Sequence, residues 1–317
     1  MATIPKKIIK KKELHSRGGS TDTTGKDENG KEKKSKSREL GDALVYAAIV
    51  AFFIKVFFFE AYRIPTGSME NTLLVGDFLI VTKFTYGSTT PRNIPFTNVR
   101  LPFVKLPGFK DPQKGDVVVF DYPGGRDEVQ SPEVLNYIKR CVGTPGDTIQ
   151  IINKEIYING VKEAFPSYGI KQPRTKQAGE SDMNMFPRGS GWNEDNYGPL
   201  YIPKEGDKIT VNPANYEQWK IFIEREGKEV RLDGESVIVD GSPLPNGEYT
   251  VEKNYYFMMG DNRNNSFDSR FWGYVSDDDI VGEALIIYWS WDANIPFSKF
   301  GDLLASIRWD RIGMPIR

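Results

Sequence analysis

The chain of 317 residues contains a single cysteine, Cys141, and a single histidine, His15. One cysteine excludes an intrachain disulfide and a multi-cysteine zinc site. One histidine in a polar tail leaves a Ser-His-Asp or Cys-His mechanism without a plausible base. The net charge is −1, so no overall basic field points to nucleic acid. We predict neither a metal nor any other cofactor.

Only one long apolar run is present, ALVYAAIVAFFIKVFFF at residues 43–59, and Lys55 is its one charge. At 1.5 Å per residue the run spans roughly 26 Å, and it can cross a hydrocarbon core about 30 Å thick if Lys55 reaches the headgroups. We therefore predict a transmembrane helix at 41–61. A buried helix of a soluble protein is one alternative. A cleavable signal peptide is another, but no small-residue cleavage site follows the run.

Residues 1–40 form a polar tail with twelve Lys or Arg against six Asp or Glu, and their lack of apolar periodicity predicts disorder. The basic residues just before the apolar run are Lys31, Lys33, Lys34, Lys36 and Arg38. By the positive-inside rule they hold this end in the cytoplasm, so the rest of the chain follows on the far side. A nucleic-acid tail is the alternative, although no aromatic residues are interleaved with the charges.

Beyond Tyr62 the pattern changes to short alternating segments bounded by Gly, Pro and Asp, which indicates antiparallel β-structure. Strands are predicted at 77–86, at 116–122, and on both sides of the Thr-Pro-Gly-Asp turn within 137–151.

The block 152–252 mixes short strand patterns with polar, Gly- and Pro-rich connections. We interpret it as a second, smaller β domain inserted into a first antiparallel β domain made of 62–151 and 253–317. The predicted fold class is therefore mainly β, with one transmembrane helix in front.

Two residues in this pattern are candidates for chemistry. Ser68 lies in the sequence Pro-Thr-Gly-Ser, where Pro65 fixes its own φ and Gly67 permits a backbone that other residues resist, so the serine is presented on a shaped turn. Strand alternation puts Lys139 on one face with Cys141. From the residues alone, Ser68 is equally an ordinary turn residue and Lys139 an edge residue whose amine reaches water. Cys141 is a small buried thiol or an alternative nucleophile.

Four stretches carry a resemblance to a known family: PTGSMENTL (65–73), GDFLIVTKFTYG (76–87), YIKRCVGTPGD (137–147) and GDNRNNSFDSRFWGYV (260–275). In order and in residue detail they resemble the motif boxes of bacterial type I signal peptidases, the membrane-bound serine peptidases that remove secretory signal sequences. The resemblance covers most of 41–292. It leaves the tail and much of the 152–252 insert uncovered.

The resemblance implies that Ser68 is the nucleophile and Lys139 the general base of a Ser-Lys dyad. Thr66 stands where the family often has a serine whose hydroxyl joins the Ser68 backbone N–H in the oxyanion hole. A free lysine with a pKa of about 10.4 is neutral in only about one molecule in 2,500 at pH 7. The amine of Lys139 must therefore be buried against apolar walls to act as a base.

The remaining roles also follow from the resemblance. Ser266 looks like the hydroxyl that orients the lysine, and Asp268 and Arg270 look like a pair that supports the site. The substrate-binding walls implied by the resemblance are Ile64, Pro65, Met69, Leu73, Tyr137 and Ile138.

The resemblance predicts a serine endopeptidase anchored in the bacterial cytoplasmic membrane, with its N-terminus in the cytoplasm and its catalytic domain outside. Its partners would be the phospholipid bilayer and membrane-inserted preproteins with signal peptides, cut after small residues at positions −1 and −3. Two alternatives remain open. One is a non-catalytic membrane-tethered β protein. The other is a self-cleaving Ser-Lys peptidase of the repressor type, which would carry a DNA-binding domain where this chain has a tail and an apolar run.

Overall fold

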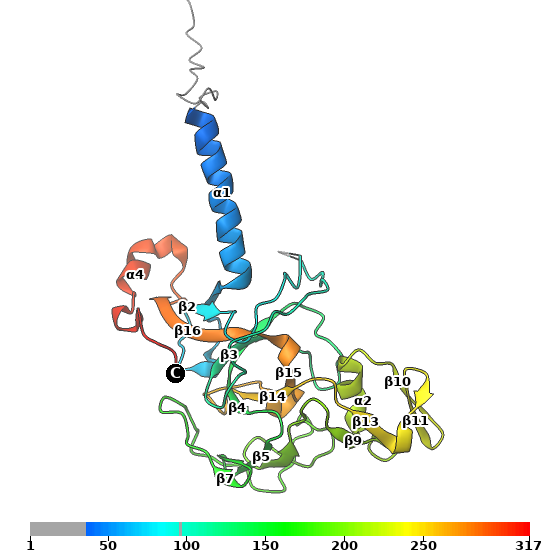
Figure 1. Cartoon of the computed structure of the whole chain (residues 1–317). Coiled ribbons are helices and arrows are strands. Elements are labelled where there is room, and N and C mark those ends of the chain that lie inside the picture. The colour runs from blue at the N-terminus through cyan, green and yellow to red at the C-terminus, as the bar shows by residue number, and fades with distance from the viewer. Residues whose placement is uncertain (1–35, 95–96) are drawn as a thin grey trace, which may run out of the picture. The chain divides into compact units, whose positions relative to one another are not determined.

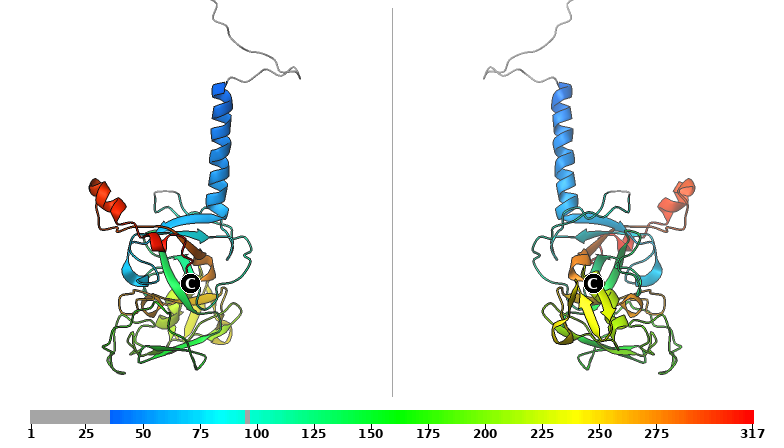
Figure 2. Two further views of the ribbon diagram at one scale, coloured as in Figure 1. Left: turned by 90° about the vertical axis from the view of Figure 1, so that its left-hand side faces the viewer. Right: turned by 90° about the vertical axis from the view of Figure 1, so that its right-hand side faces the viewer.

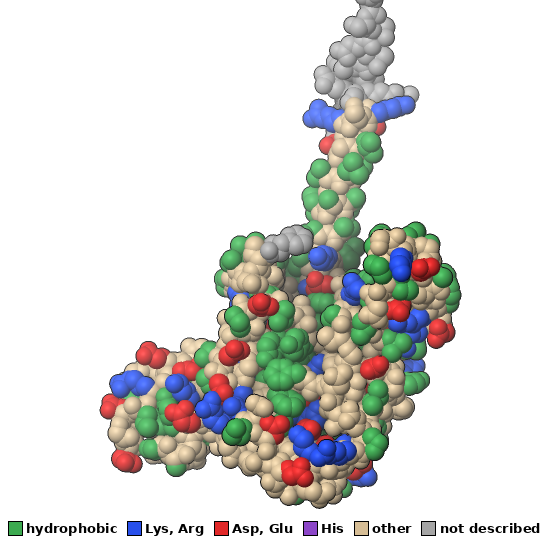
Figure 3. Space-filling model, turned by 180° about the vertical axis from the view of Figure 1, so that it is seen from behind, with side chains coloured by type: hydrophobic (Ala, Val, Ile, Leu, Met, Phe, Trp, Pro, Cys, Tyr) green, Lys and Arg blue, Asp and Glu red, His purple; other side chains and the backbone are tan. Residues whose placement is uncertain are grey.

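A computed structural model describes residues 36–94 and 97–317 (Figure 1). Its first element is helix α1, Lys36–Phe57, which is about 33 Å long at 1.5 Å per residue. Among the described residues it is the one helix long and apolar enough to cross a membrane. Figure 3 shows basic side chains at its N-terminal end and apolar side chains along its length. Most of the predicted tail lies outside the described residues.

The bounds of α1 differ from the predicted 41–61. Residues 36–40, which we predicted to be disordered, are helical, because Lys, Arg, Glu and Leu are good helix formers and extend the apolar helix at its start. At the other end, strand β1 (Phe59–Arg63) pairs with strand β2 (Asp77–Thr82) from Phe59 opposite Thr82 onward. This long-range pairing ends the helix at Phe57.

Seven strands form one antiparallel sheet in the order β1-β2-β16-β3-β4-β14-β15. The further strands of this sheet are β3 Val117–Asp121, β4 Asn136–Gly143, β14 Tyr255–Met259, β15 Val275–Ser276 and β16 Ile280–Ser290. The pairing register shifts once between β14 and β4, twice between β16 and β2, and once between β16 and β3. Such bulges bend strands and increase their twist, which curls the sheet. The prediction of a mainly β protein is confirmed.

Three smaller sheets, ordered β7-β6-β5-β8, β10-β11-β12 and β13-β9, are built from the insert and from strand β5, which begins just before it. Their strands are β5 Thr148–Ile152, β6 Glu155–Ile158, β7 Val161–Lys162, β8 Tyr197–Tyr201, β9 Lys208–Thr210, β10 Val230–Asp233, β11 Ser236–Val239, β12 Ser242–Pro243 and β13 Glu248–Thr250. The remaining α-helices are α2 Tyr216–Arg225, α3 Ser269–Trp272 and α4 Phe300–Ala305. The 3-10 helices are Gly67–Met69, Pro245–Gly247, Asp277–Asp279, Phe297–Lys299 and Trp309–Arg311.

Strand β14 joins the insert to the main sheet. All five of its residues are buried, and they alternate between two apolar clusters: Tyr255, Phe257 and Met259 pack with the insert, whereas Tyr256 and Met258 pack with β3 and β4. The insert elements, green to yellow in Figure 2, accordingly lie on the side of β14 that faces away from β3. Residues Phe52–Arg317 form one compact unit, so the division into two β domains stays a prediction.

Candidate active site

Ser68 lies on the 3-10 turn Gly67–Met69 between β1 and β2. The chain is held on entering and leaving this turn, because the Ile64 N–H donates to the Asp77 carbonyl oxygen (2.9 Å) and the Gly76 N–H donates to the Ile64 carbonyl oxygen (3.0 Å). The next residue, Met69, is fully buried and anchors the turn from below. Ser68 itself is only half-buried, so its hydroxyl is presented on a fixed backbone.

Lys139 meets Ser68 from strand β4. Its Nζ donates to Ser68 Oγ at 2.8 Å and to the Ile138 carbonyl oxygen at 3.1 Å. The residue is 5% exposed. Burial lowers the pKa of the Lys139 amine from 10.5 to about 8, although the carboxylates of Asp268 and Asp261 act in the opposite direction. The amine is therefore neutral in an appreciable fraction of molecules near neutral pH, within hydrogen-bonding distance of a hydroxyl.

A second network on β4 ties the candidate site together. Arg140 binds Asp261 through two parallel contacts, Nε to Oδ1 at 2.8 Å and Nη2 to Oδ2 at 2.6 Å. Asp261 Oδ2 also accepts the Thr72 hydroxyl at 2.6 Å, and the Asn262 N–H donates to the Ser68 carbonyl oxygen at 3.1 Å. Charge-assisted, bidentate contacts of this kind are strong and directional. They fix the serine turn, β4 and the loop after β14 to one another.

Sequence reasoning missed this second network. Asp261 and Asn262 stand inside the stretch 260–275 and Arg140 inside the stretch 137–147, but none of the three was singled out. An arginine on the buried face of a β-strand needs an acidic partner, because an unpaired buried charge is costly. That requirement was the signal that pointed to an acidic residue in another motif.

The predicted supporting pair is in contact. Arg270 binds Asp268 through Nε to Oδ1 and Nη2 to Oδ2, both at 2.8 Å, and both residues are buried. Asp268 also accepts the Gly260 N–H at 3.1 Å, and Arg270 Nη2 donates to the Arg263 carbonyl oxygen at 2.6 Å. The pair therefore holds both ends of the 260–270 loop.

Ser266 and Thr66 make fewer contacts than the resemblance implied. Ser266 Oγ is buried and makes no well-formed hydrogen bond with any described residue. It lies beside Asp268, whose carboxyl pKa is raised by burial but held below its usual value chiefly by the Arg270 guanidinium, with a smaller effect of Ser266. The Lys139 amine donates to Ser68 Oγ and the Ile138 carbonyl oxygen rather than to Ser266. Thr66 is exposed in an extended conformation, with φ −131° and ψ 157°, so its hydroxyl is accessible beside the turn.

The predicted substrate walls separate into two groups. Met69 and Leu73 are 0% exposed and Ile64 is 2% exposed, and all three belong to the apolar core beneath the turn. They present almost no surface in the absence of a peptide, and their role as substrate contacts stays a prediction. Pro65 is exposed, and Tyr137 and Ile138 are half-buried, so these three can still line a binding surface.

Cys141 does not reach the candidate site. It is fully buried, its thiol points to the Gly143 carbonyl oxygen at 3.6 Å, and burial raises the pKa of the thiol. The thiolate is therefore disfavoured, which argues against the alternative nucleophile. His15 lies outside the described residues. Within residues 36–94 and 97–317, no cluster of three or more His, Cys, Asp or Glu side chains could hold a metal ion.

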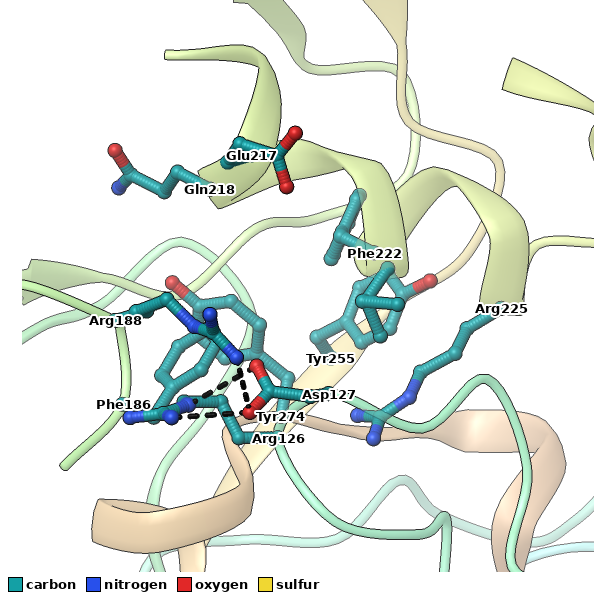
Figure 4. A pocket seen from close by; sticks show the side chains of 11 residues that line it. Arg126, Asp127, Phe186, Arg188, Glu217, Gln218, Phe222, Arg225, Tyr255 and Tyr274 are labelled. Atoms are coloured by element: carbon teal, nitrogen blue, oxygen red, sulfur yellow. Dashed lines mark hydrogen bonds and ion pairs between the residues drawn. The ribbon is translucent and has the colours of Figure 1, made fainter. Parts of the chain in front are cut away.

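A concavity next to helix α2 lies apart from Ser68 and Lys139 (Figure 4). Its basic side chains already have partners: Arg126 and Arg188 form ion pairs with Asp127 at 3.0 and 2.7 Å, and Arg225 donates to the Gly125 carbonyl oxygen at 2.7 Å. None of the residues predicted for catalysis lines it.

Comparisons with known proteins identify the family. The family described as "Signal peptidase, peptidase S26" matches residues 37–289. Signal peptidase I of Pseudomonas aeruginosa is 32% identical over 281 residues, covering 83% of this chain and 78% of the relative. Signal peptidase I of Buchnera aphidicola subsp. Schizaphis graminum is 34% identical over 278 residues, covering 83% and 77%.

Among solved structures, a signal peptidase I from Enterococcus faecalis V583 is 19% identical and covers 55% of this chain and 97% of its own, with a TM-score of 0.23 that is too low to bear on the fold. The sequence matches favour a peptidase over the non-catalytic and the repressor-type alternatives. They also confirm the resemblance carried by the four motif stretches. The chain therefore belongs to the signal peptidase family, peptidase S26, and is a serine endopeptidase of the signal peptidase I type.

Proposed function

We propose that this chain removes signal peptides from secreted preproteins, with Ser68 as the nucleophile and Lys139 as the general base. The observation that supports the proposal most is the 2.8 Å contact between Lys139 Nζ and Ser68 Oγ, made by an almost fully buried amine. A neutral amine at this distance can accept the hydroxyl proton as the oxygen attacks a peptide carbonyl.

In the acylation step, Lys139 takes the proton of Ser68 while Oγ bonds to the carbonyl carbon before the scissile bond. The negative charge that develops on the carbonyl oxygen is stabilised by the Ser68 N–H and the Thr66 hydroxyl. The Lys139 ammonium then gives its proton to the leaving amine, and the peptide C–N bond breaks. The products are the free amino terminus of the mature protein and a signal-peptide ester on Ser68.

In the deacylation step, the neutral Lys139 amine takes a proton from water as the water oxygen attacks the ester. The proton returns to Ser68 Oγ when the ester bond breaks, so the enzyme is regenerated without net change. We assign Ser266 to orienting the amine during these transfers, because its hydroxyl is buried next to Gly260, close to the backbone of Ser68. Asp268 and Arg270 support the loop that carries it.

The substrate path follows from a gap in the main sheet. Strand β14 pairs with β4 only from Arg140 to Gly143, so residues 136–138 lack a partner on that side. The Cys141 N–H donates to the Asp116 carbonyl oxygen next to β3, which means that Asn136 and Ile138 direct their N–H and C=O groups away from β3. An extended signal-peptide segment can therefore add as a strand at this edge and lead its carbonyl to Ser68.

A strand bound in this way presents alternate side chains to the same wall, so the first and third residues before the cut face it together. Pro65, Tyr137 and Ile138 provide that wall in the proposal. Because the core beneath them is filled by Met69 and Leu73, the pockets are shallow, and small side chains at positions −1 and −3 are preferred.

The membrane supplies the remaining part of the proposal. Helix α1 anchors the protein in the bacterial cytoplasmic membrane, with the basic residues before it in the cytoplasm and the β domains outside. Anchored preproteins then share one thin layer with the enzyme, which raises their effective concentration. Protease added outside sealed cells should degrade the region after residue 60 and spare the tail; the opposite pattern would overturn this orientation.

The dyad is tested by incubating the purified chain with a signal-bearing preprotein and sequencing the new amino terminus. Ser68→Ala and Lys139→Ala should each leave a folded protein, as judged by circular dichroism, that produces no mature terminus. Cys141→Ser is the matched control in the same strand and should process normally. Processing by the Ser68 or Lys139 variant at the native rate would refute the assignment.

A further inference from the structure

Part of the insert borders the 260–270 loop, which we call the active-site loop because it carries Ser266, Asp268 and Arg270. Ile170 pairs with Asn262 as a short parallel bridge: its N–H donates to the Asp261 carbonyl oxygen at 2.9 Å, and its carbonyl oxygen accepts the Arg263 N–H at 3.1 Å. The Gln172 N–H donates to Asn264 Oδ1 at 3.0 Å. Residues 165–174, which we call the insert segment, are therefore joined by hydrogen bonds to the active-site loop.

Buried charge fixes the insert segment in place. Lys154 is 7% exposed, and its Nζ donates to the carbonyl oxygens of Gln172, at 2.8 Å, and Arg174 and forms an ion pair with Asp195 at 3.6 Å. The Phe165 ring lies 4.2 Å from Lys171 Nζ, within the insert segment.

The same ring lies 4.9 Å from Arg263 Cζ of the active-site loop. The insert segment is thus held by the buried Lys154 amine and by contacts with the active-site loop, so its surface has a fixed position relative to Ser68.

The active-site loop separates this surface from the nucleophile. The Asn262 N–H donates to the Ser68 carbonyl oxygen at 3.1 Å, and Asn262 Nδ2 donates to the Gly67 carbonyl oxygen at 3.1 Å. The serine turn, the loop and the insert segment thus lie in a row. Neighbouring hydrogen-bonded chains are about 4.8 Å apart, which places Ile170 about 10 Å from Ser68.

The direction in which the bound peptide runs places the active-site loop and the insert segment beside the residues that follow the cut. In the proposed function, the signal peptide lies along residues 136–138, on one side of Lys139. On the other side β4 is covered by β14, with Arg140 opposite Met259, and β14 leads directly into the active-site loop. A peptide that continues past Ser68 therefore runs toward this loop. About 10 Å corresponds to three residues of extended chain, so the early residues of the mature protein reach the insert segment.

From this arrangement, and resting on the proposed function, we propose that the insert segment binds the first residues of the mature protein, those that follow the cut. Tyr168 is 60% exposed on it and offers a rigid surface with a polar tip for an extended polypeptide. Glu70 is exposed on the serine turn, and no basic side chain among the described residues pairs with its carboxylate. The surface therefore favours an unfolded mature N-terminus with a basic residue near the cut.

The test compares two synthetic substrates that are identical through the first residue after the cut. One ends there as an amide, and the other continues for six mature residues. The native enzyme should cleave the extended substrate with a higher kcat/KM, and Tyr168→Ala should lose this advantage while it cleaves the short substrate as the native enzyme does. Met183→Ala, at an 88% exposed side chain elsewhere in the insert, is the matched control and should keep the advantage.

A Tyr168→Ala enzyme that retains the full advantage of the extended substrate would overturn the inference, and so would an equal loss on both substrates. An error in the proposed catalytic dyad would be recognised separately, because the Ser68→Ala enzyme would then still cleave the short substrate. Charge gives a second readout. Native enzyme should prefer Lys to Glu at the second residue after the cut by about two- to fivefold, the range of an exposed ion pair, and Glu70→Gln should bring this ratio to about one. An unchanged ratio would also count against the inference.

Discussion

The pH dependence of cleavage tests Lys139 as the base. Burial lowers the pKa of its amine to about 8, and only the neutral amine can accept the Ser68 proton. Because kcat/KM reports the free enzyme, it should follow the neutral fraction and rise with pH through 8. That fraction is about 1% at pH 6, about 9% at pH 7 and about 90% at pH 9.

The expected profile therefore rises about 90-fold between pH 6 and pH 9, close to tenfold per pH unit below 7, and levels off above 9. An amine with an unperturbed pKa of 10.5 would instead rise about 1,000-fold over the same range without a plateau. The increase in kcat/KM from pH 6 to pH 9 is therefore more than tenfold larger for a solvated amine than for the buried one. The assay can therefore separate a buried base from a solvated one.

The assay measures initial rates on detergent-solubilised enzyme, with an end-blocked peptide that has no side chain titrating between pH 6 and pH 9. Histidine side chains ordinarily titrate near the lower end of this range, and His15 is the one histidine in the chain. His15→Gln is therefore the control and should reproduce the native profile. A flat profile, or an inflection near pH 6.5 that disappears in His15→Gln, would refute the reasoning.

Three further predictions concern the site. Lys139→Met should be inactive yet more stable at pH 7 by up to about 3 kcal/mol, because a lysine whose pKa is lowered on folding destabilises the folded state below pH 8. This penalty fades as the pH rises toward 10.5. Urea unfolding at pH 7 and pH 10.5 measures both free energies, and a loss of stability at pH 7 would contradict the prediction. Thr66→Val should lower kcat by about 10²- to 10³-fold with KM unchanged, whereas Thr66→Ser stays near native; steady-state kinetics decide, and a change confined to KM would exclude an oxyanion role. Asp268→Asn should lower the free energy of unfolding by about 3–5 kcal/mol because it leaves the Arg270 guanidinium buried without its charge partner; a loss below about 1 kcal/mol in denaturant titration would show that the pair is not a structural support.

Local signals predicted much of the fold, and long-range pairing set what they missed. Alternation bounded by glycines indicated the strand that begins at Asp77, but the strand ends at Thr82 rather than at residue 86. The helix ended four residues early because the residues after Phe57 pair with β2. Helix α2 has polar and charged residues between its apolar ones and was not predicted within the insert.

The candidate site was predicted unevenly for a similar reason. Motif resemblance brought Ser68 and Lys139 together, and the structure places their side chains in contact. It did not indicate how far each residue is buried: Met69 and Leu73, which we predict as substrate contacts, are both fully buried. Burial is a property of the whole fold and depends on neighbours such as Leu79 and Val81, which no short motif contains.

The adjacency of Lys139 and Arg140 on β4 has a consequence for how the enzyme acquires activity. Neighbouring residues of a strand project to opposite faces, so a slip of β4 by a single residue would misplace the base whichever way the strand moves. In one direction Arg140, which stays protonated, would occupy the place of Lys139, and Cys141 would face Asp261. In the other direction Ile138 would occupy the place of Lys139, and Asp261 would face a lysine that cannot match its two oxygens with a planar fork. If Lys139 is the base, a misaligned sheet would be chemically silent as well as less stable, and proteolytic activity would appear only with the correctly paired sheet.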